Sequence, residues 1–189
     1  QNTAVGAAAL DAVTTSNNHV AVGYNSLSAN TSGEKNTAVG SGTLAINTSG
    51  EKNVAIGYVA LELNTSGSQN TAVGEEALAD NTTGGFNTAV GANALDSNST
   101  GSSNVAMGTS ALQANTTADE NTAIGSSCLT FNTTGTGNVG LGRNALRNNT
   151  TANNNTGIGF EALKANTTGV GNTAVGKTAM PANTTGNNN

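Results

Sequence analysis

The stretch NTAVGSGTLAINTSGEK (residues 36–52) is followed directly by NVAIGYVALELNTSGSQ (residues 53–69), a second unit of 17 residues with the same pattern. This division continues without insertion or deletion from residue 2 to residue 188 and gives eleven units. They begin at Asn2, His19, Asn36, Asn53, Asn70, Asn87, Asn104, Asn121, Asn138, Asn155 and Asn172. A fixed short period is typical of solenoid proteins, in which each repeat packs only on its neighbours.

Three positions of the unit, numbered from one to seventeen, carry most of the pattern. Position five is Gly in every unit, which predicts a corner where the backbone takes a positive φ. Position four is always Val, Ile, Leu or Met, and position nine is Leu in ten units and Met180 in the last. We expect positions four and nine to face inward, and the variable positions six, seven, ten, eleven, sixteen and seventeen to face water.

The local sequence favours short strands separated by polar turns. The segment Asn-Thr-Ala-Val-Gly predicts one strand, and the Ala-Leu pair before Asn-Thr-Thr-Gly predicts a second. Asn occupies positions one and twelve in ten of eleven units each. Coils of a solenoid stack at about 4.8 Å, where side-chain amides can bond to one another. We therefore predict an all-β parallel β-solenoid, or β-roll, of eleven 17-residue coils, a single repeat domain over residues 2–188 about 50 Å long.

Small residues occupy two further positions. Position three is Ala or Gly in every unit, as in Ala72, Ala89, Gly140 and Gly157, and position eight is Ala, Ser, Thr or Cys. One interpretation is that small side chains relieve crowding near the corner. The other is that a second backbone packs closely on this face, and it favours a parallel homotrimer.

The composition excludes several classes of function. Only 9% of residues are charged, the net charge is −5, and no Lys/Arg cluster exists to bind nucleic acid phosphates. No apolar run is long enough for a membrane span. Because Cys128 is the only cysteine, an internal disulfide is excluded.

No constellation of catalytic residues emerges from the sequence. His19, the only histidine, replaces an Asn of position one and is interpreted as a tolerated polar substitution. Cys128 takes a position that holds small residues in the other units, which favours a buried structural residue over a nucleophile. Glu75 and Glu76 are adjacent, so they point apart along a strand and do not form the carboxylate pair of a glycoside hydrolase. The Asp residues at Asp11, Asp80, Asp96 and Asp119 share no constant set of positions. We expect no enzyme, no cofactor, and no catalytic, cofactor-binding or metal-binding residue.

Two recurring features are candidates for binding. Asn-[Ser/Thr]-[Ser/Thr] triplets begin at Asn30, Asn47, Asn64, Asn81, Asn98, Asn115, Asn132, Asn149, Asn166 and Asn183. Each coincides with a predicted turn, so a structural Asn ladder is favoured over glycosylation. Tyr24, Tyr58 and Phe160 share position six, where aromatic rings are candidates for contacts with sugars or with a neighbouring chain.

The unit resembles the repeats of phage and bacterial tail-fibre-like surface proteins. Its Asn-x-Ala-[Val/Ile]-Gly-x-x-Ala core is similar to the head repeat of trimeric autotransporter (YadA-like) adhesins. The similarity rests on Val22-Gly23, Val39-Gly40 and Ile56-Gly57, with equivalents whose small residue follows three positions later, as in Ala60, Ala77 and Ala94. The resemblance implies a left-handed β-roll in a trimeric, surface-exposed fibre without catalytic residues. The longer period of this chain departs from the adhesin pattern, which leaves the trimer packing open.

These features predict a structural or adhesive segment of an extracellular fibre, such as a tail fibre or an adhesin shaft or head, on a cell surface or virion. The expected partners are copies of the chain, in a parallel homotrimer or an end-to-end filament, and host-surface glycans. Because the chain starts in phase at Gln1 without a capping unit, we expect it to be an excerpt of a longer fibrous chain. An ice-binding solenoid and a glycosylated filament are the alternatives. A glycan-processing tail spike would need carboxylate pairs that the sequence lacks.

Overall fold

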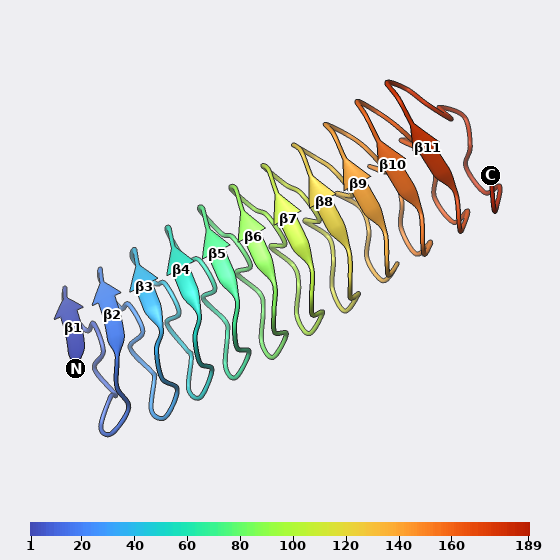
Figure 1. The fold of residues 1–189 in the computed structure, drawn as a ribbon. Coiled ribbons are helices and arrows are strands. Elements are labelled where there is room, and N and C mark those ends of the chain that lie inside the picture. The colour runs from blue at the N-terminus through green and yellow to red at the C-terminus, as the bar shows by residue number, and fades with distance from the viewer.

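The computed structural model describes all 189 residues as a single row of stacked coils, with the two termini at opposite ends (Figure 1). Each coil contributes one short strand, and turns and bends form the rest of it. The strands are β1 (Asn2–Val5), β2 (His19–Val22), β3 (Thr37–Val39), β4 (Val54–Ile56), β5 (Thr71–Val73), β6 (Thr88–Val90), β7 (Val105–Met107), β8 (Thr122–Ile124), β9 (Val139–Leu141), β10 (Thr156–Ile158) and β11 (Thr173–Val175).

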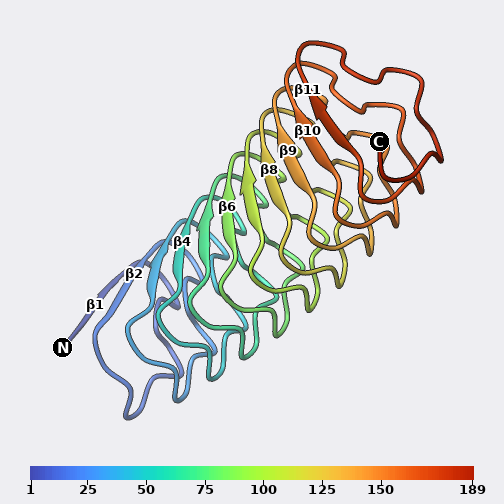
Figure 2. The same ribbon diagram turned by 45° about the vertical axis from the view of Figure 1, so that its right-hand side comes forward.

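All eleven strands form one sheet in the order of the sequence, and each strand runs parallel to the next. The register advances by one unit per strand, so that Ala72 of β5 lies between Ala55 of β4 and Ala89 of β6. Figure 2 shows the chain returning from each strand to the next around the same closed path. The predicted parallel β-solenoid with 17-residue coils is therefore confirmed.

The prediction of a second strand in each coil is wrong. Positions six to eleven form turns, and the backbone there takes positive φ at positions seven and nine, as at Asn93 (φ 56°) and Leu95 (φ 54°). A positive φ curls the chain where a strand would need it extended. Hydrogen bonds between coils continue through this segment, for example from the Leu95 N–H to the Ala111 carbonyl at 3.0 Å. The ladder between coils therefore does not depend on strand geometry.

The core is a thin layer of Ala and Leu. Leu at position nine is fully buried in the nine coils from Leu27 to Leu163, as predicted. It packs against the small side chains of positions three and eight, which belong to the same buried cluster of 23 residues. The space is tight, because a Cβ atom added at Gly157 would lie 3.1 Å from Cγ of Leu146. The small residues of position three thus face the interior of their own coil, where space is short, and not a second backbone.

The prediction that position four faces inward is wrong. From β2 to β11 the residue at position three is buried, and the residue at position four lies on the outer side of the sheet. Successive side chains of a strand point to opposite faces, so only one of the two neighbours can reach the core. The Leu of position nine already fills most of the interior, and the remaining space admits Ala but not Val.

The invariant Gly of position five does mark a corner. All eleven of these glycines have φ between +126° and +141°. A Cβ atom added at Gly6 would also lie 2.5 Å from the carbonyl oxygen of Gly23 in the next coil. Both the backbone conformation and the close approach of adjacent coils therefore require glycine here.

Position twelve forms the predicted ladder of side-chain amides. Nδ2 of Asn47 donates to Oδ1 of Asn30 at 2.7 Å and to the Gly50 carbonyl at 3.1 Å. The same bonds recur from coil to coil as far as Asn183. Each amide therefore links two coils and closes its own turn, and no buried side-chain nitrogen or oxygen lacks a partner.

Position one forms a different ladder, in which side chains bond to the backbone. Oδ1 of Asn53 accepts the backbone N–H of Asn70 at 2.9 Å, and Nδ2 of Asn53 donates to the Gly67 carbonyl at 2.9 Å. This arrangement joins the start of one coil both to the start of the next coil and to the end of the same coil.

Of the variable positions, six and seventeen face water as predicted, whereas position seven is half-buried in nine coils. Position six is exposed in ten coils, and position seventeen is exposed wherever it is not glycine. Position ten departs from the expectation, because Ala45, Ala79 and Thr130 are buried there. Position ten lies next to the inward Leu of position nine, so small side chains at position ten are covered by neighbouring residues.

Candidate interaction surface

The outward side of the sheet carries two parallel rows of side chains, which we call the outer sheet face. The row of position two consists of Thr3, Val20, Thr37, Val54, Thr71, Thr88, Val105, Thr122, Val139, Thr156 and Thr173. The row of position four consists of Val5, Val22, Val39, Ile56, Val73, Val90, Met107, Ile124, Leu141, Ile158 and Val175. Both rows lie outward because the Ala or Gly between them lies inward.

The row of position four is an apolar stripe along the whole solenoid, exposed in six coils and half-buried in the other five. Met107 and Leu141 in the middle coils are 41% and 42% exposed, and Ile56 is 40% exposed. Single exposed apolar residues are common on proteins, whereas a continuous apolar row is a candidate for an interaction surface. Sequence reasoning assigned this row to the core and so missed it. The sequence did contain a signal for it. Because side chains of a strand alternate between the two faces, an inward Asn at position one implies that position three is inward and position four outward.

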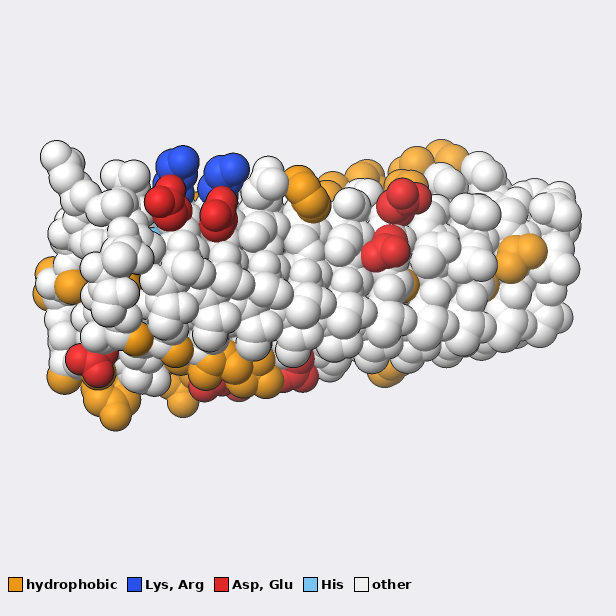
Figure 3. Space-filling model, turned by 90° about the horizontal axis from the view of Figure 1, so that it is seen from below, with side chains coloured by type: hydrophobic (Ala, Val, Ile, Leu, Met, Phe, Trp, Pro, Cys, Tyr) orange, Lys and Arg blue, Asp and Glu red, His pale blue; other side chains and the backbone are white.

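No charged residue belongs to the outer sheet face, although the chain carries a net charge of −5. In Figure 3 the charged side chains form small separate groups, and most of the surface in view is uncharged. The charges next to the outer sheet face lie at its two edges. Position seventeen, just before each strand, carries Lys35, Lys52 and Glu120, and position six, just after it, carries Glu75, Arg143 and Lys177.

The Thr and Ser residues of positions thirteen and fourteen form a polar turn away from the sheet. At position thirteen the hydroxyl bonds to the next coil, as when Oγ1 of Thr82 donates to the Ser99 carbonyl at 2.9 Å. The residues of position fourteen, such as Thr83 and Thr100, are exposed in every coil. The adjacent hydroxyl rows therefore differ in role, one bonding to the neighbouring coil and the other facing water.

The ring of His19 takes over the role of the Asn that it replaces. Its Nδ1 accepts the backbone N–H of Asn36 at 3.3 Å, and its Nε2 lies 3.1 Å from Oγ of Ser16 and 3.3 Å from Nδ2 of Asn30. Burial is the main cause that lowers the pKa of His19, which favours the neutral ring. The ring is 1% exposed and lies within a structural ladder.

Cys128 and the pair Glu75 and Glu76 are not brought into a reactive arrangement. Burial raises the pKa of the Cys128 thiol to about 12, and a thiol is a poor nucleophile while it stays protonated. Glu75 is exposed at position six, whereas Glu76 accepts a hydrogen bond from Nδ2 of Asn93 at 2.6 Å.

The aspartates do not gather into a metal-binding cluster. No group of three or more His, Cys, Asp or Glu side chains is placed to hold a metal ion. Asp96 is half-buried, and burial, followed by the nearby charges of Asp80 and Glu76, raises the pKa of its carboxyl group. These carboxylates repel one another, and Asp11 and Asp119 lie in distant coils.

The Asn residues of the Asn-[Ser/Thr]-[Ser/Thr] triplets are interior residues. From Asn30 to Asn166 each is fully buried, and each Nδ2 donates to the ladder or to its own turn. A glycan on such a nitrogen would need the coil to open, so the folded turn leaves no room for it.

The three aromatic residues of position six lie on the surface but far apart. Tyr24 and Tyr58 are 66% and 58% exposed and are separated by one coil, and Phe160 lies six coils beyond Tyr58. The guanidinium carbon of Arg143 is 5.9 Å from the centre of the Phe160 ring. These rings do not form one continuous aromatic platform.

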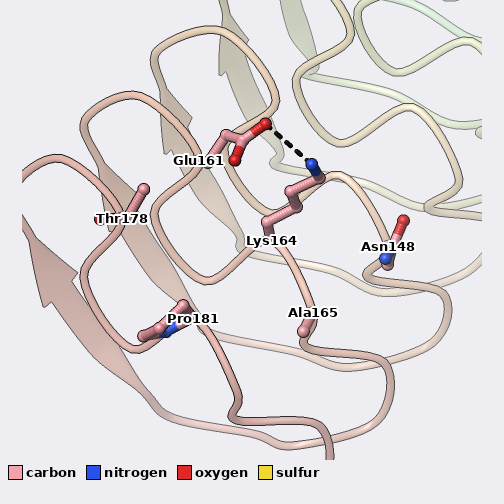
Figure 4. A pocket seen from close by; sticks show the side chains of 6 residues that line it. All are labelled: Asn148, Glu161, Lys164, Ala165, Thr178 and Pro181. Atoms are coloured by element: carbon pink, nitrogen blue, oxygen red, sulfur yellow. Dashed lines mark hydrogen bonds and ion pairs between the residues drawn. The ribbon is translucent and has the colours of Figure 1, made fainter.

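One hollow of about 340 Å³ lies on the surface of the last three coils, lined by Asn148, Glu161, Lys164, Ala165, Thr178 and Pro181 (Figure 4). Its charged groups bind each other, because Nζ of Lys164 donates to Oε1 of Glu161 at 2.7 Å. This hydrogen bond is the main cause that lowers the pKa of Glu161. The hollow therefore presents no unpaired charge to a ligand.

The structure contains no helix with the length and apolarity that crossing a membrane requires. No protein-family model, no curated protein and no solved structure matches this chain. The outer sheet face, with its charged edges, is thus the feature of the molecule that points most directly to a function.

Proposed function

We propose that the chain is a structural segment of an extracellular fibre, of the tail-fibre or trimeric-adhesin kind, located on a cell surface or virion. In this proposal copies of the chain associate side by side through the outer sheet face, and a parallel homotrimer is the favoured arrangement. The observation that carries the proposal is the unbroken outward row of Val, Ile, Leu and Met at position four.

The size of the outer sheet face suits association between copies. Eleven strands spaced at about 4.8 Å, each about 13 Å long, give a strip of roughly 600 Å². Stable interfaces bury roughly 800 Å² per partner, so the strip accounts for part of such an interface; in a ring of three, where two neighbours share the strip, its two edges must supply the rest. Because every coil adds about the same area, the area of such an interface increases with the number of coils.

A parallel ring is favoured by the shape of the face. The two rows run along the solenoid axis, so parallel copies can meet over their full length. In a closed ring the leading edge of one copy meets the trailing edge of the next, which leaves no apolar row exposed. This geometry, together with the resemblance of the repeat to trimeric adhesin heads, supports three copies.

The mass of the chain in solution tests this proposal. Light scattering on the 189-residue chain is expected to give three times the monomer mass of 18.4 kDa. Electron micrographs should contain rods of uniform width whose length corresponds to eleven coils. A monomer at concentrations well above micromolar would contradict the proposal.

Ice binding is a second candidate that one observation favours. Seven of the eleven residues of position two are Thr, and these lie on the flat outer sheet face and not in the turn of positions thirteen and fourteen, namely Thr3, Thr37, Thr71, Thr88, Thr122, Thr156 and Thr173. Regular rows of Thr and Val methyl groups on a flat sheet can order water. Thermal hysteresis in solutions of the monomeric chain would favour ice binding. If no thermal hysteresis were measured, the fibre proposal would be retained.

A further inference from the structure

We propose that four strands supply most of the binding energy of the outer sheet face, and that each of them lies level with the same strand of the neighbouring copy. These four, which we call the paired-apolar strands, are β2, β4, β7 and β9. The inference rests on the proposed side-by-side association, and it adds to that association the contact residues and the register between copies.

The paired-apolar strands carry an apolar side chain at both outward positions. Position two is Val in these four strands and Thr in the other seven, which we call the Thr strands. Position four is apolar throughout, and its only Met and its only Leu belong to paired-apolar strands. The four pairs are Val20 with Val22, Val54 with Ile56, Val105 with Met107, and Val139 with Leu141.

The paired-apolar strands also present larger exposed apolar side chains than the Thr strands. Between β2 and β10, the three most exposed residues of position four are Ile56, Met107 and Leu141. On the Thr strands of this range, position four is half-buried except at Ile124. Binding energy is concentrated in a few residues of an interface and is not proportional to contact area. The paired-apolar strands are therefore the hot spots of the outer sheet face.

The order of the paired-apolar strands determines how two parallel copies fit. The four strands are separated by two, three and two coils, or roughly 10, 14 and 10 Å along the axis. Level copies bring all four into contact with their equivalents, whereas a shift of one coil matches none, of two coils two, and of three coils one. Each mismatch sets a Thr hydroxyl against an apolar side chain, which costs free energy unless the hydroxyl is hydrogen-bonded.

A closed ring requires the same level register. Cyclic symmetry relates neighbouring copies by rotation alone, because a shift along the axis would add up around the ring and leave it open. The positions of Val among Thr and the symmetry of the proposed trimer therefore favour one arrangement. An antiparallel pair would match β2 with β9 and β4 with β7, since the spacing is the same in both directions, but antiparallel copies do not form this ring.

Single cysteines on the outer sheet face test the register. In the full chain with Cys128→Ala, we expect Ile56→Cys, Met107→Cys and Leu141→Cys each to be linked to its own equivalent in a second copy. The reagent is a thiol crosslinker about 10 Å long, the spacing of packed sheets. Linked chains are identified by mass after denaturation.

Mixtures of two single-cysteine chains, combined before assembly, are the controls. Ile56→Cys with Met107→Cys reports the antiparallel pair, and Met107→Cys with Leu141→Cys reports a shift of two coils. In level copies these cysteines are two or three coils apart, so products that link one variant to the other should be minor.

Matched changes on two strands test the hot spots. Ile56→Val, on a paired-apolar strand, should weaken association by about four-fold per copy, the effect of one buried methylene group. The same change on a Thr strand, Ile124→Val, should weaken it less. Thr122→Val, which makes β8 a fifth paired-apolar strand, should strengthen association. Sedimentation over a range of concentrations measures all three variants.

The outcomes separate this inference from the fibre proposal. If the chain is a trimer but is linked mainly in a mixture, or if Ile56→Val and Ile124→Val weaken it equally, this inference is wrong and the side-by-side association stands. A trimer that gives no linked product does not associate through the outer sheet face, which contradicts both. A monomeric chain also contradicts both.

Discussion

Ala89 points into the solenoid, and its neighbour Val90 points out of it. The smaller of two adjacent apolar side chains is thus the core residue, and the larger one lies on the surface. From β2 onward, this order repeats in every coil that has Ala at position three and Val, Ile or Met at position four. If these side chains served only the core of their own chain, a large apolar residue would not be needed at the outward position in all eleven coils.

The Leu column should be essential for folding. Leu95→Asp places a charge in a thin apolar core that offers it no partner, so the neighbouring coils are expected to unfold. The control Ser97→Asp, half-exposed two residues later, should melt close to the wild type. A circular dichroism melt compares the two variants, and equal melting temperatures would refute the assignment of position nine to the core.

Position three should tolerate no larger side chain. In Ala89→Leu the added atoms would meet the Leu column, as the tight contact of Gly157 with Leu146 indicates. We expect a loss of about 1–3 kcal/mol in the free energy of unfolding of the monomer. Thr88→Leu, the matched change on the outward neighbour, should leave that quantity nearly unchanged. Urea denaturation measures both, and a reversed order would mean that the strand faces the other way.

The amide ladder should contribute to stability at every coil. Nδ2 of Asn98 donates to Oδ1 of Asn81 and to the Gly101 carbonyl, and its own Oδ1 accepts from Asn115. In Asn98→Ala these buried groups lose partners, at a cost of about 1–3 kcal/mol for each group left unsatisfied. Urea denaturation should reveal this loss, whereas Ser97→Ala should have almost no effect. A neutral Asn98→Ala would mean that the ladder does not hold the coils together.

The second coil should lose stability in acid because of His19. Burial lowers the pKa of the folded ring below its ordinary value of 6.5, so the unfolded chain binds the proton more readily. The stabilising contribution is therefore complete above pH 6.5 and is lost as the pH falls below it. Protonated Nδ1 also cannot accept the Asn36 N–H. The nearby charges of Glu34 and the N-terminal amino group act in opposite directions.

Hydrogen exchange at the Asn36 amide, compared between pH 7.5 and pH 5, measures this effect. His19→Asn restores the residue found at position one in every other coil, and its protection should not change across that range beyond the intrinsic exchange rate. If the wild type and His19→Asn behaved alike, His19 would have no part in the pH response.

The sequence alone predicts much of this fold. The period gives the coil length, the invariant Gly gives the corner, and the amide columns give the ladders, because each of these depends on residue type at a fixed spacing. The facing of Ala89 and Val90 was not predictable from size, since the larger residue would ordinarily be placed inside. It depends on how much space Leu95 and its equivalents leave, which is a property of the packed coil.

The absence of a second strand could not be predicted from the sequence, for a related reason. Leu is seldom found with a positive φ, yet Leu95 and its equivalents all have it. The chain accepts this conformation because the hydrogen bonds to adjacent coils hold it there. As a consequence, the turn conformation of positions seven to nine became visible only in the folded structure.

The most direct test of the outer sheet face is the sedimentation of Val90→Asp beside the wild type and Thr83→Asp. Thr83 is exposed on the turn of position fourteen, so its variant is the matched control for an added charge. We predict that Val90→Asp stays folded and sediments as an 18.4 kDa monomer, while the wild type and Thr83→Asp sediment as the trimer. Identical sedimentation of all three proteins would contradict the central claim that copies meet through this face.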